Sequence, residues 1–203
     1  MIEVKNLSFS YNDKETILKD VSLTVNPGEI VALIAPSGYG KTTLGKIISG
    51  YLKPDEGEVT VDGKDIMDYE GFKPVQLVHQ HPEKSIDPKW KVRKILNEGW
   101  QVNEDVKTKF GIKEFWLEKF PQELSGGELQ RICLARAMSD KCKYLVADEI
   151  TTMVDSITQV QLSEVLLHFV REHGVGVLFI SHNVKLLERI ADRTIDLREI
   201  NKR

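Results

Sequence analysis

The sequence of 203 residues lacks the features that mark several classes of protein. It has only two cysteines, Cys133 and Cys142, whose spacing matches no metal site, so a reducing compartment is the simplest setting. No run approaches the roughly 18 apolar residues of a membrane-spanning helix. The first residues, MIEVKNLSFSY, alternate as in a strand and lack the apolar core of a signal peptide. We therefore expect that any membrane function depends on another subunit that crosses the bilayer.

An excess of charge of one sign is also missing. The 28 lysine and arginine residues nearly balance the 31 aspartate and glutamate residues, which leaves a formal net charge of -3. This balance argues against a protein that binds nucleic acid or an acidic membrane through bulk charge. Hydrophobic residues make up 41% of the chain, and no internal repeat or low-complexity segment is present. The composition therefore predicts one globular domain, with or without an attached lobe.

Apolar patterning predicts strands that alternate with helices. Residues 2–25 alternate as in a half-exposed antiparallel sheet, whereas IVALIA at 30–35 is the continuous apolar run of a buried parallel strand. Apolar residues at helical spacing predict a helix over 44–52, and residues 81–124 form a charged, partly helical candidate lobe. The remaining elements are expected as short strands (57–80), a helix (126–139), a strand (143–148), a helix (around 162–170), a strand (175–181) and a final helix and strand. This order indicates a mostly parallel α/β core.

The segment APSGYGKTT, residues 35–43, lies between the buried strand and the helix that follows it. It matches the phosphate-binding pattern G-x-x-x-x-G-K-[ST], except that Ala35 replaces the first glycine. In such a loop, backbone N–H groups and the helix N-terminus hold phosphate oxygens, Lys41 bridges the outer phosphates, and the Thr42 hydroxyl ligates Mg²⁺. The alternative is a glycine-rich turn that binds nothing. Ala35 adds strain only if its backbone requires a positive φ angle.

Two acidic residues, Asp148 and Glu149, end the predicted strand YLVAD. A buried strand that ends in two acids brings both carboxylates to the carboxyl edge of the sheet, where α/β proteins bind ligands. There Asp148 is expected to hold Mg²⁺, and Glu149 is expected to act as the general base for an attacking water. A strand that ends in solvated acids is the alternative, and the phosphate loop upstream argues against it.

Residues 124–138 read LSGGELQRICLARAM, a second serine-glycine loop that runs into a helix. This segment resembles the signature of the ATP-binding-cassette (ABC) ATPases, and the resemblance covers essentially the whole chain. It implies one ABC ATPase domain over residues 1–203, with a P-loop NTPase core and an N-terminal antiparallel β subdomain (1–80 and 140–203). A helical signature lobe (about 81–139) is inserted into this core. In the family, two cassettes pair head to tail, and each ATP lies between the phosphate loop of one and the signature of the other.

The resemblance also implies roles for individual residues, of which Lys41, Glu149 and His182 would be catalytic. Tyr11 would stack on adenine, and His182 would contact the γ-phosphate, although each is by itself more typical of an ordinary structural residue. The expected Mg²⁺ ligands are Thr42, Gln80 and Asp148, and Gln80 would also contact the nucleotide. Further expected nucleotide contacts are Pro36, Ser37, Gly38, Tyr39, Gly40 and Thr43. Residues expected to face the partner cassette are Ser125, Gly126, Gly127 and Glu128 of the signature and Asp155 of the crossing loop.

The sequence departs from the family pattern at several positions. Besides Ala35, Tyr39 stands where a small residue is usual, Glu128 stands where glutamine is frequent, and Asp-Glu-Ile replaces the commoner Asp-Glu-Pro. The ring of Tyr39 faces either the nucleotide or the partner cassette. The residues on which hydrolysis depends in the family are all retained: Lys41, Asp148, Glu149 and His182. The resemblance therefore implies an active ATPase.

Three functions compete for such a cassette: an importer ATPase, a non-transport cassette that acts on DNA or ribosomes, and a regulatory cassette that hydrolyses ATP weakly. The stretch between Lys41 and Ser125 is short and has no sustained heptads, which argues against the coiled-coil arms of DNA-repair cassettes. A single cassette without membrane spans favours an importer. Residues 80–98, QHPEKSIDPKWKVRKILNE, resemble the peptide and nickel importer subfamily, so the cargo is expected to be an oligopeptide or dipeptide, nickel or a metal chelate.

The importer interpretation implies ATP and Mg²⁺ as cofactors and a second ABC ATPase subunit, identical or different, as partner. It also implies transmembrane permease subunits and, indirectly, an extracytoplasmic solute-binding protein, with no nucleic acid. The chain would lie at the cytoplasmic face of the cell membrane as a peripheral subunit. A short permease helix would dock near Gln80 and residues 81–124. Trp90, Trp100 and Trp116 either line that groove or form the lobe's own core.

Overall fold

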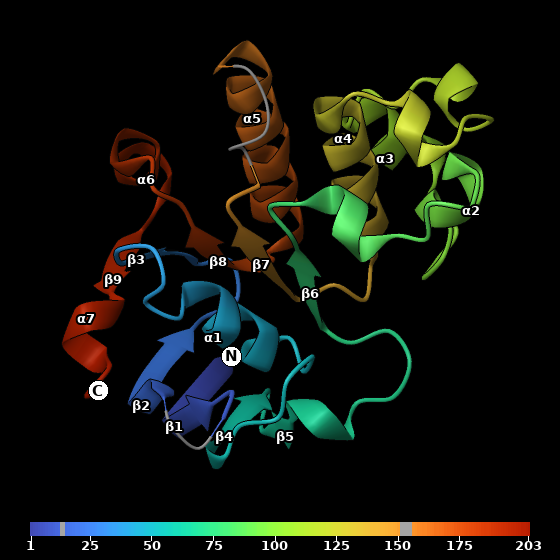
Figure 1. Cartoon of the computed structure of the whole chain (residues 1–203). Helices are drawn as coiled ribbons and strands as arrows, with labels where there is room; N and C mark the ends of the chain where they lie inside the picture. The colour runs from blue at the N-terminus through green and yellow to red at the C-terminus, as the bar shows by residue number, and fades with distance from the viewer. Residues whose placement is uncertain (13–14, 151–155) are drawn as a thin grey trace.

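The computed structural model describes residues 1–12, 15–150 and 156–203, in which two sheets are stacked (Figure 1). The first sheet is antiparallel, as the alternating pattern predicted, and its strand order is β2-β1-β4-β5. Its inward residues are buried and its outward residues are exposed, as a period of two requires. The strands are β1 (Ile2–Ser10), β2 (Thr16–Val25), β4 (Glu56–Val61) and β5 (Lys64–Asp65).

The second sheet has the order β6-β7-β8-β3-β9, and every pairing in it is parallel. Its strands are β3 (Ile30–Ile34), β6 (Val75–Val78), β7 (Tyr144–Asp148), β8 (Gly176–Ile180) and β9 (Arg193–Asp196). The expected fold class, a mostly parallel α/β core with an antiparallel β subdomain, is confirmed. All five residues of β7 and all five of β8 are buried, because both faces of this sheet are covered.

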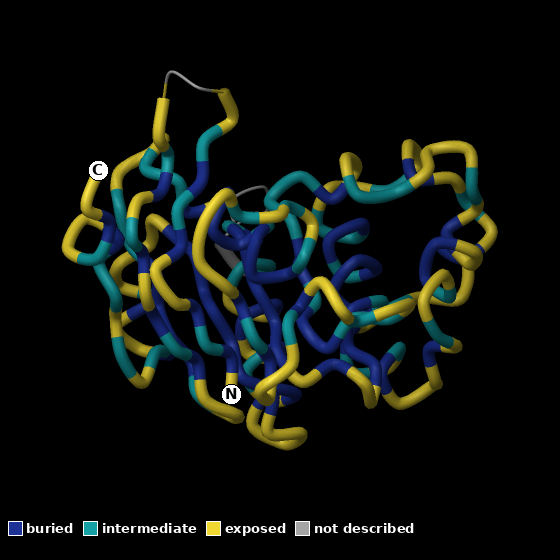
Figure 2. Tube along the Cα trace, turned by 90° about the horizontal axis from the view of Figure 1, so that it is seen from below, coloured by how far each residue is buried: buried dark blue, intermediate teal, exposed yellow. Residues whose placement is uncertain are grey.

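Alternate residues of the central strands enter two different hydrophobic cores. In β3, Val31 and Leu33 face the core shared with the antiparallel sheet and α1 (Lys41–Ile48), whereas Ile30 and Ala32 face the opposite core. That second core contains residues of α5 (Ser156–His173), α6 (Val184–Ile190) and the helical lobe. In Figure 2 the buried segments run through the interior and the exposed segments form the outer turns. The last helix, α7 (Leu197–Ile200), lies beside β2 near the C-terminus (Figure 1).

Helix α1 follows the phosphate loop as predicted, but it ends earlier than the apolar spacing over 44–52 indicated. It covers Lys41–Ile48 with Ser49 as its C-cap, and Gly50, with a positive φ of 72°, ends it. Tyr51, expected on the buried stripe, is therefore 65% exposed. The apolar pattern continued past the helix because Leu52 still packs against the core from an irregular segment.

The helical lobe consists of short elements around one long helix, α4 (Gly126–Ala137). Trp116 is buried in the hydrophobic core that contains residues of both α4 and the parallel sheet. Trp90 and Trp100 are partly buried and pack against the same core. Of the two interpretations of the tryptophans, this supports the lobe's own core. The other elements are the helices α2 (Val92–Leu96) and α3 (Glu104–Lys109) and the 3-10 turns Pro82–Ser85, Glu114–Trp116 and Pro121–Glu123.

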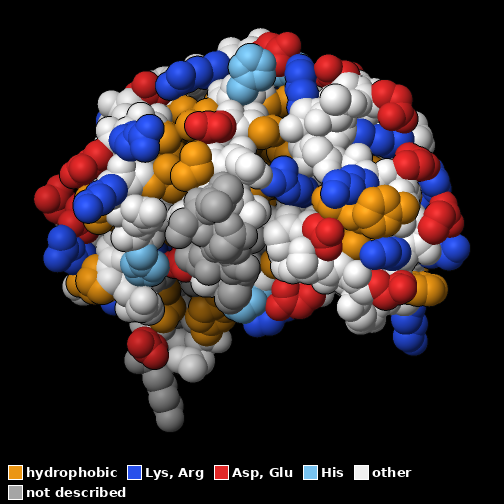
Figure 3. Space-filling view, turned by 90° about the horizontal axis from the view of Figure 1, so that it is seen from above, with side chains coloured by type: hydrophobic (Ala, Val, Ile, Leu, Met, Phe, Trp, Pro, Cys, Tyr) orange, Lys and Arg blue, Asp and Glu red, His pale blue; other side chains and the backbone are white. Residues whose placement is uncertain are grey.

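The surface carries charges of both signs. On the face seen in Figure 3, Lys and Arg side chains are interspersed with Asp and Glu, in keeping with the small net charge. Within residues 1–12, 15–150 and 156–203, no helix combines the length and the apolar character that a bilayer crossing requires.

Candidate nucleotide-binding site

The loop between β3 and α1 has the backbone of a phosphate-binding loop. Gly38 and Gly40 have φ angles of 76° and 96°, which side chains rarely tolerate. A Cβ atom on Gly40 would also lie 2.9 Å from Cγ2 of Ile17, so β2 presses directly on the loop. The backbone N–H of Tyr39 donates to the Pro36 carbonyl at 3.3 Å, which turns the loop into the start of α1. The pattern recognised in the sequence therefore lies where a strand, a turn and a helix N-terminus meet.

Ala35, the departure from the pattern, introduces no left-handed backbone. Among the described residues, the non-glycine positions with positive φ are Asn6, Asp20, Asp62 and Glu149. The Ala35 side chain instead packs against the core and lines a small cavity beside the loop. The strain considered for this substitution is therefore not present.

Lys41 lies across the loop. Its Nζ donates to the carbonyls of Ala35 at 2.7 Å and Pro36 at 3.1 Å, and the residue is only 6% exposed. Burial lowers the pKa of Lys41, and the carboxylates of Glu149 and Asp148 oppose this shift. A buried ammonium held by two carbonyls at a loop of N–H donors is well placed to contact phosphate oxygens.

The two acids lie at the carboxyl end of β7, but in different surroundings. Asp148 is 4% exposed, and burial raises its pKa, while a hydrogen bond from the Thr42 hydroxyl opposes the shift. Glu149 has a φ of 50°, and its backbone N–H donates to the Ile180 carbonyl at 2.9 Å on the neighbouring strand β8. A non-glycine residue in this region costs about 1 kcal/mol or more, and such strain tends to occur at functional sites.

The strained backbone of Glu149 places its side chain against His182, which follows β8. Oε1 of Glu149 lies 2.9 Å from Nε2 of His182, and the histidine side chain is 46% exposed. The sequence-based analysis gave these residues separate roles and did not predict their contact. The contact arises because β7 and β8 are neighbouring parallel strands whose ends meet at one edge.

The expected catalytic residues and most of the expected nucleotide-binding residues surround one open cavity of about 320 Å³, whereas Pro36 and Gln80 line two other cavities. Lys41, Glu149 and His182 line it together with Tyr11, Ile17 and the loop residues 37–43. The Tyr11 hydroxyl lies 3.2 Å from Oγ1 of Thr43, and the residue is 59% exposed. An exposed ring anchored at its hydroxyl, with Phe9 packed edge-on at 5.0 Å, can serve as a platform for a flat base.

The expected Mg²⁺ ligands line a neighbouring cavity of about 560 Å³ that contains Thr42, Gln80 and Asp148. A hydroxyl, an amide and a carboxylate form an all-oxygen set, the type that Mg²⁺ prefers. Among the described residues, no group of three or more His, Cys, Asp or Glu side chains could form a cage for a metal. The residues therefore fit an ion that is held by few protein oxygens and by substrate phosphates.

The signature residues lie apart from both cavities, at the N-terminus of α4. Ser125 caps this helix: its hydroxyl accepts from the Glu128 N–H at 3.3 Å, and the Glu128 carboxylate accepts from the Ser125 N–H at 2.8 Å. This capping box gives Glu128 a structural role that the analysis of the sequence did not identify. Gly126 and Gly127 begin the helix. Asp155 lies outside the described residues.

Two residues near the phosphate loop were missed by the sequence-based analysis. Ile17 lines the cavity, and Arg203 places its guanidinium 4.1 Å from the centre of the Tyr39 ring. Ile17 could have been suspected from its place shortly after Tyr11. No signal in the sequence points to Arg203, because only the tertiary fold brings the end of the chain to the loop.

Comparisons with known proteins agree with this geometry. The chain is 32% identical to the oligopeptide transport ATP-binding protein OppF of Streptococcus mutans, over 95% of this chain and 70% of that protein. It is 32% identical to the nickel import ATP-binding protein NikE of Rhodospirillum rubrum, over 91% of this chain and 73% of that protein. The solved dimeric structure of MJ0796, a bacterial ABC transporter cassette, superposes with a TM-score of 0.82 at 26% identity and covers 97% of this chain and 94% of that one.

The family profile described as ABC transporter matches residues 18–152, which include the phosphate loop, the signature helix and the acid pair. Together with the relatives above and the arrangement of two sheets and a helical lobe, this match leaves one assignment: the chain belongs to the ABC transporter family of ATP-binding cassettes.

Proposed function

We propose that this chain is the ATP-hydrolysing subunit of an ABC importer and energises uptake of a small solute through separate membrane subunits. The observation that carries this proposal is the convergence of Lys41, Glu149 and His182 on one cavity beside the phosphate loop. The relatives are named for oligopeptide transport and nickel import, which supports one of these cargo classes.

Binding of ATP begins at the phosphate loop. The N–H groups of the loop and of the first turn of α1 donate to the phosphates, and Lys41 exchanges the carbonyls of Ala35 and Pro36 for phosphate oxygens. Adenine stacks on the exposed ring of Tyr11. The buried position of Lys41 strengthens its attraction to phosphate, because little water screens the charge.

Hydrolysis uses the two residues that meet at the strand ends. Glu149 orients a water and accepts its proton as the water attacks the γ-phosphate in line. Before ATP binds, Nε2 of His182 lies 2.9 Å from the Glu149 carboxylate and keeps the glutamate in position; with ATP bound, His182 donates to the γ-phosphate instead. Lys41 stabilises the negative charge that develops on the transferred group.

Mg²⁺ would be held by Thr42, Asp148 and Gln80, where it would neutralise charge between the outer phosphates. Burial is the main cause of the raised pKa of Asp148, and a bound cation would favour the ionised carboxylate. Gln80 lines the same cavity as Thr42 and Asp148 and precedes the lobe in the chain, so it would link the occupied site to the lobe.

The signature residues complete the site of a second cassette. In this chain they lie at the N-terminus of α4, outside the cavity that contains Lys41 and Glu149. A head-to-tail dimer would place Ser125, Gly126 and Gly127 of one subunit against the γ-phosphate bound to the other. ATP would thus close the dimer, hydrolysis would reopen it, and this difference in affinity would drive the membrane subunits.

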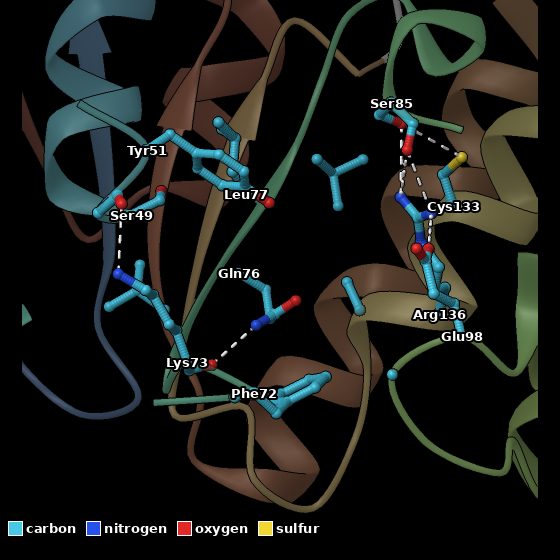
Figure 4. A pocket seen from close by; sticks show the side chains of 16 residues that line it. Ser49, Tyr51, Phe72, Lys73, Gln76, Leu77, Ser85, Glu98, Cys133 and Arg136 are labelled. Carbon is cyan, nitrogen blue, oxygen red and sulfur yellow. Dashed lines mark hydrogen bonds and ion pairs between the residues drawn. The ribbon is translucent and has the colours of Figure 1, made fainter. Parts of the chain in front are cut away.

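A groove between the parallel sheet and the lobe offers a docking site for the permease. It has a volume of about 600 Å³, with Tyr51, Gln76 and Leu77 on the core side and Ser85, Cys133 and Arg136 on the lobe side (Figure 4). It shares Tyr51, Leu77, Ser85 and Arg136 with the cavity that contains Gln80. A permease helix in this groove would therefore sense the nucleotide site. We place the subunit at the cytoplasmic face of the membrane, with an extracytoplasmic solute-binding protein as an indirect partner.

The proposal is tested by replacing Glu149 with Gln. Loss of the general base should lower the ATPase rate by at least about 100-fold, while ATP still binds and holds two cassettes together. The ATPase rate, ATP affinity and sedimentation of the variant should be compared with those of the wild type, alone and with a sister cassette. An unchanged rate would contradict the catalytic assignment. A wild-type rate near zero would favour the regulatory alternative.

A further inference from the structure

The C-terminal segment is fastened to β2 next to the phosphate loop. The Asn201 side chain bonds the backbone on both sides of Leu18: Nδ2 donates to the Ile17 carbonyl at 3.0 Å, and Oδ1 accepts from the Lys19 N–H at 2.9 Å. The Lys202 N–H donates to the Lys19 carbonyl at 3.0 Å. Asn201 is buried, so these bonds hold the segment in place.

This attachment brings Arg203 to the phosphate loop. Its guanidinium lies 4.1 Å from the centre of the Tyr39 ring, the geometry of a cation–π contact. Tyr39 immediately precedes Gly40 and lines the cavity that also contains Lys41. The charge of Arg203 therefore lies within about one Debye length, roughly 8 Å at physiological ionic strength, of the loop backbone.

Negative charge accumulates at the cavity when a nucleotide binds. The carboxylate of Glu149 lines the cavity beside Lys41, and Asp148 immediately precedes Glu149 at the end of β7. A nucleoside triphosphate brings several further negative charges. A guanidinium stacked on Tyr39, a residue that lines the cavity, would offset part of this repulsion, because it remains charged at any working pH.

We propose that Arg203, stacked on Tyr39, is a further nucleotide-binding residue that attracts the phosphates of ATP. The proposal rests on the ATP binding proposed above. It assigns a purpose to the tyrosine in the phosphate loop: the ring holds the guanidinium beside the phosphates, whereas a small residue would leave it to solvent. Ile17, which touches both the loop and the C-terminal segment, fixes the distance between them.

The test measures ATP affinity by calorimetry on the full chain, with Arg203→Ala compared with Lys202→Ala. The control removes a neighbouring exposed cation whose Nζ pairs with Asp20 instead of approaching the loop. At about 0.1 M salt, Arg203→Ala should raise the Kd for ATP about threefold to tenfold, and Lys202→Ala should change it less than about twofold. At about 1 M salt, where the Debye length falls to about 3 Å, the two variants should converge.

Further measurements distinguish attraction of phosphate by Arg203 from a purely structural role of this residue. The loss in Arg203→Ala should be largest for ATP, smaller for ADP and absent for adenosine. Tyr39→Ala removes the ring against which the guanidinium lies and should reproduce the salt-sensitive loss. Equal affinities of Arg203→Ala and Lys202→Ala at about 0.1 M salt would overturn this inference but not the proposed function. A loss that persists at high salt and extends to adenosine would do the same. A wild-type chain that does not bind ATP would overturn the proposed function as well.

Discussion

The phosphate loop and the signature loop each precede a helix, but only the second helix has side-chain partners for its first backbone N–H groups. No side chain among the described residues caps α1, whose N-cap is Gly40, and its first turn holds no acid. Helix α4 has a complete capping box between Ser125 and Glu128, with an acid in its first turn. The donors of α1 are therefore left for an anion, whereas those of α4 are partly satisfied within the chain. This difference supports the proposal that the first loop binds phosphate within its own chain and that the signature faces a partner cassette.

The largest effect is expected from removing Lys41, the cation of the phosphate loop. Lys41→Ala should weaken ATP binding about 10- to 100-fold, because charge-assisted hydrogen bonds to phosphate are lost in a poorly screened site. Calorimetry with Mg-ATP measures this change. Lys53→Ala, an exposed lysine beyond the same helix, serves as the control and should bind as the wild type does. Equal ATP affinity of the two variants would show that Lys41 does not contribute to ATP binding by the single chain.

The second prediction concerns the signature loop. Ser125→Ala should lower the ATPase rate about tenfold at saturating ATP and destabilise the chain by about 1 kcal/mol through loss of the cap. Its ATP affinity as a single chain should not change, because Ser125 lies outside the cavity of its own chain. Glu128→Gln preserves a capping-box residue and serves as the stability control. Weaker ATP binding by a monomer of Ser125→Ala would contradict the division between the two loops.

A smaller effect tests the buried acid beside the phosphate loop. Because the folded-state pKa of Asp148 is raised, the folded chain binds a proton more readily than the unfolded chain, so ionised Asp148 disfavours folding as pH rises above about 4. Without nucleotide, Asp148→Asn should raise Tm by about 1 to 3 °C at pH 7, and the gain should disappear toward pH 4. The exposed control Asp140→Asn should show no such gain. A lower Tm for Asp148→Asn at pH 7 would show that ionised Asp148 stabilises the loop.

The smallest expected effect concerns the substituted position of the loop. Ala35→Gly should change ATP affinity less than about threefold, because Ala35 has no left-handed backbone to relieve. Added backbone freedom should instead slightly lower stability. Titration with ATP and thermal melts would measure both quantities. A tenfold gain in affinity would mean that the Ala35 side chain obstructs the loop.

Much of this architecture could be predicted because it depends on local rules. The continuous apolar runs of β3, β7 and β8 predicted buried parallel strands, and the loop and acid pair were expected at their carboxyl ends. The end of α1 was predicted wrongly, because Leu52 packs against the core from an irregular segment after Gly50 instead of from a helix. Local pattern does not distinguish a helix face from a loop that returns to the same core.

By itself, the sequence determined the chemistry that is available: glycines for a tight loop, a lysine and a threonine behind it, and two acids at a strand end. The tertiary structure alone decided which groups meet. Parallel pairing of β7 with β8 places Glu149 against His182, and the attachment of the last residues to β2 places Arg203 over Tyr39. Spacing along a chain constrains neighbours within a few residues, whereas contacts between distant segments depend on sheet order and packing.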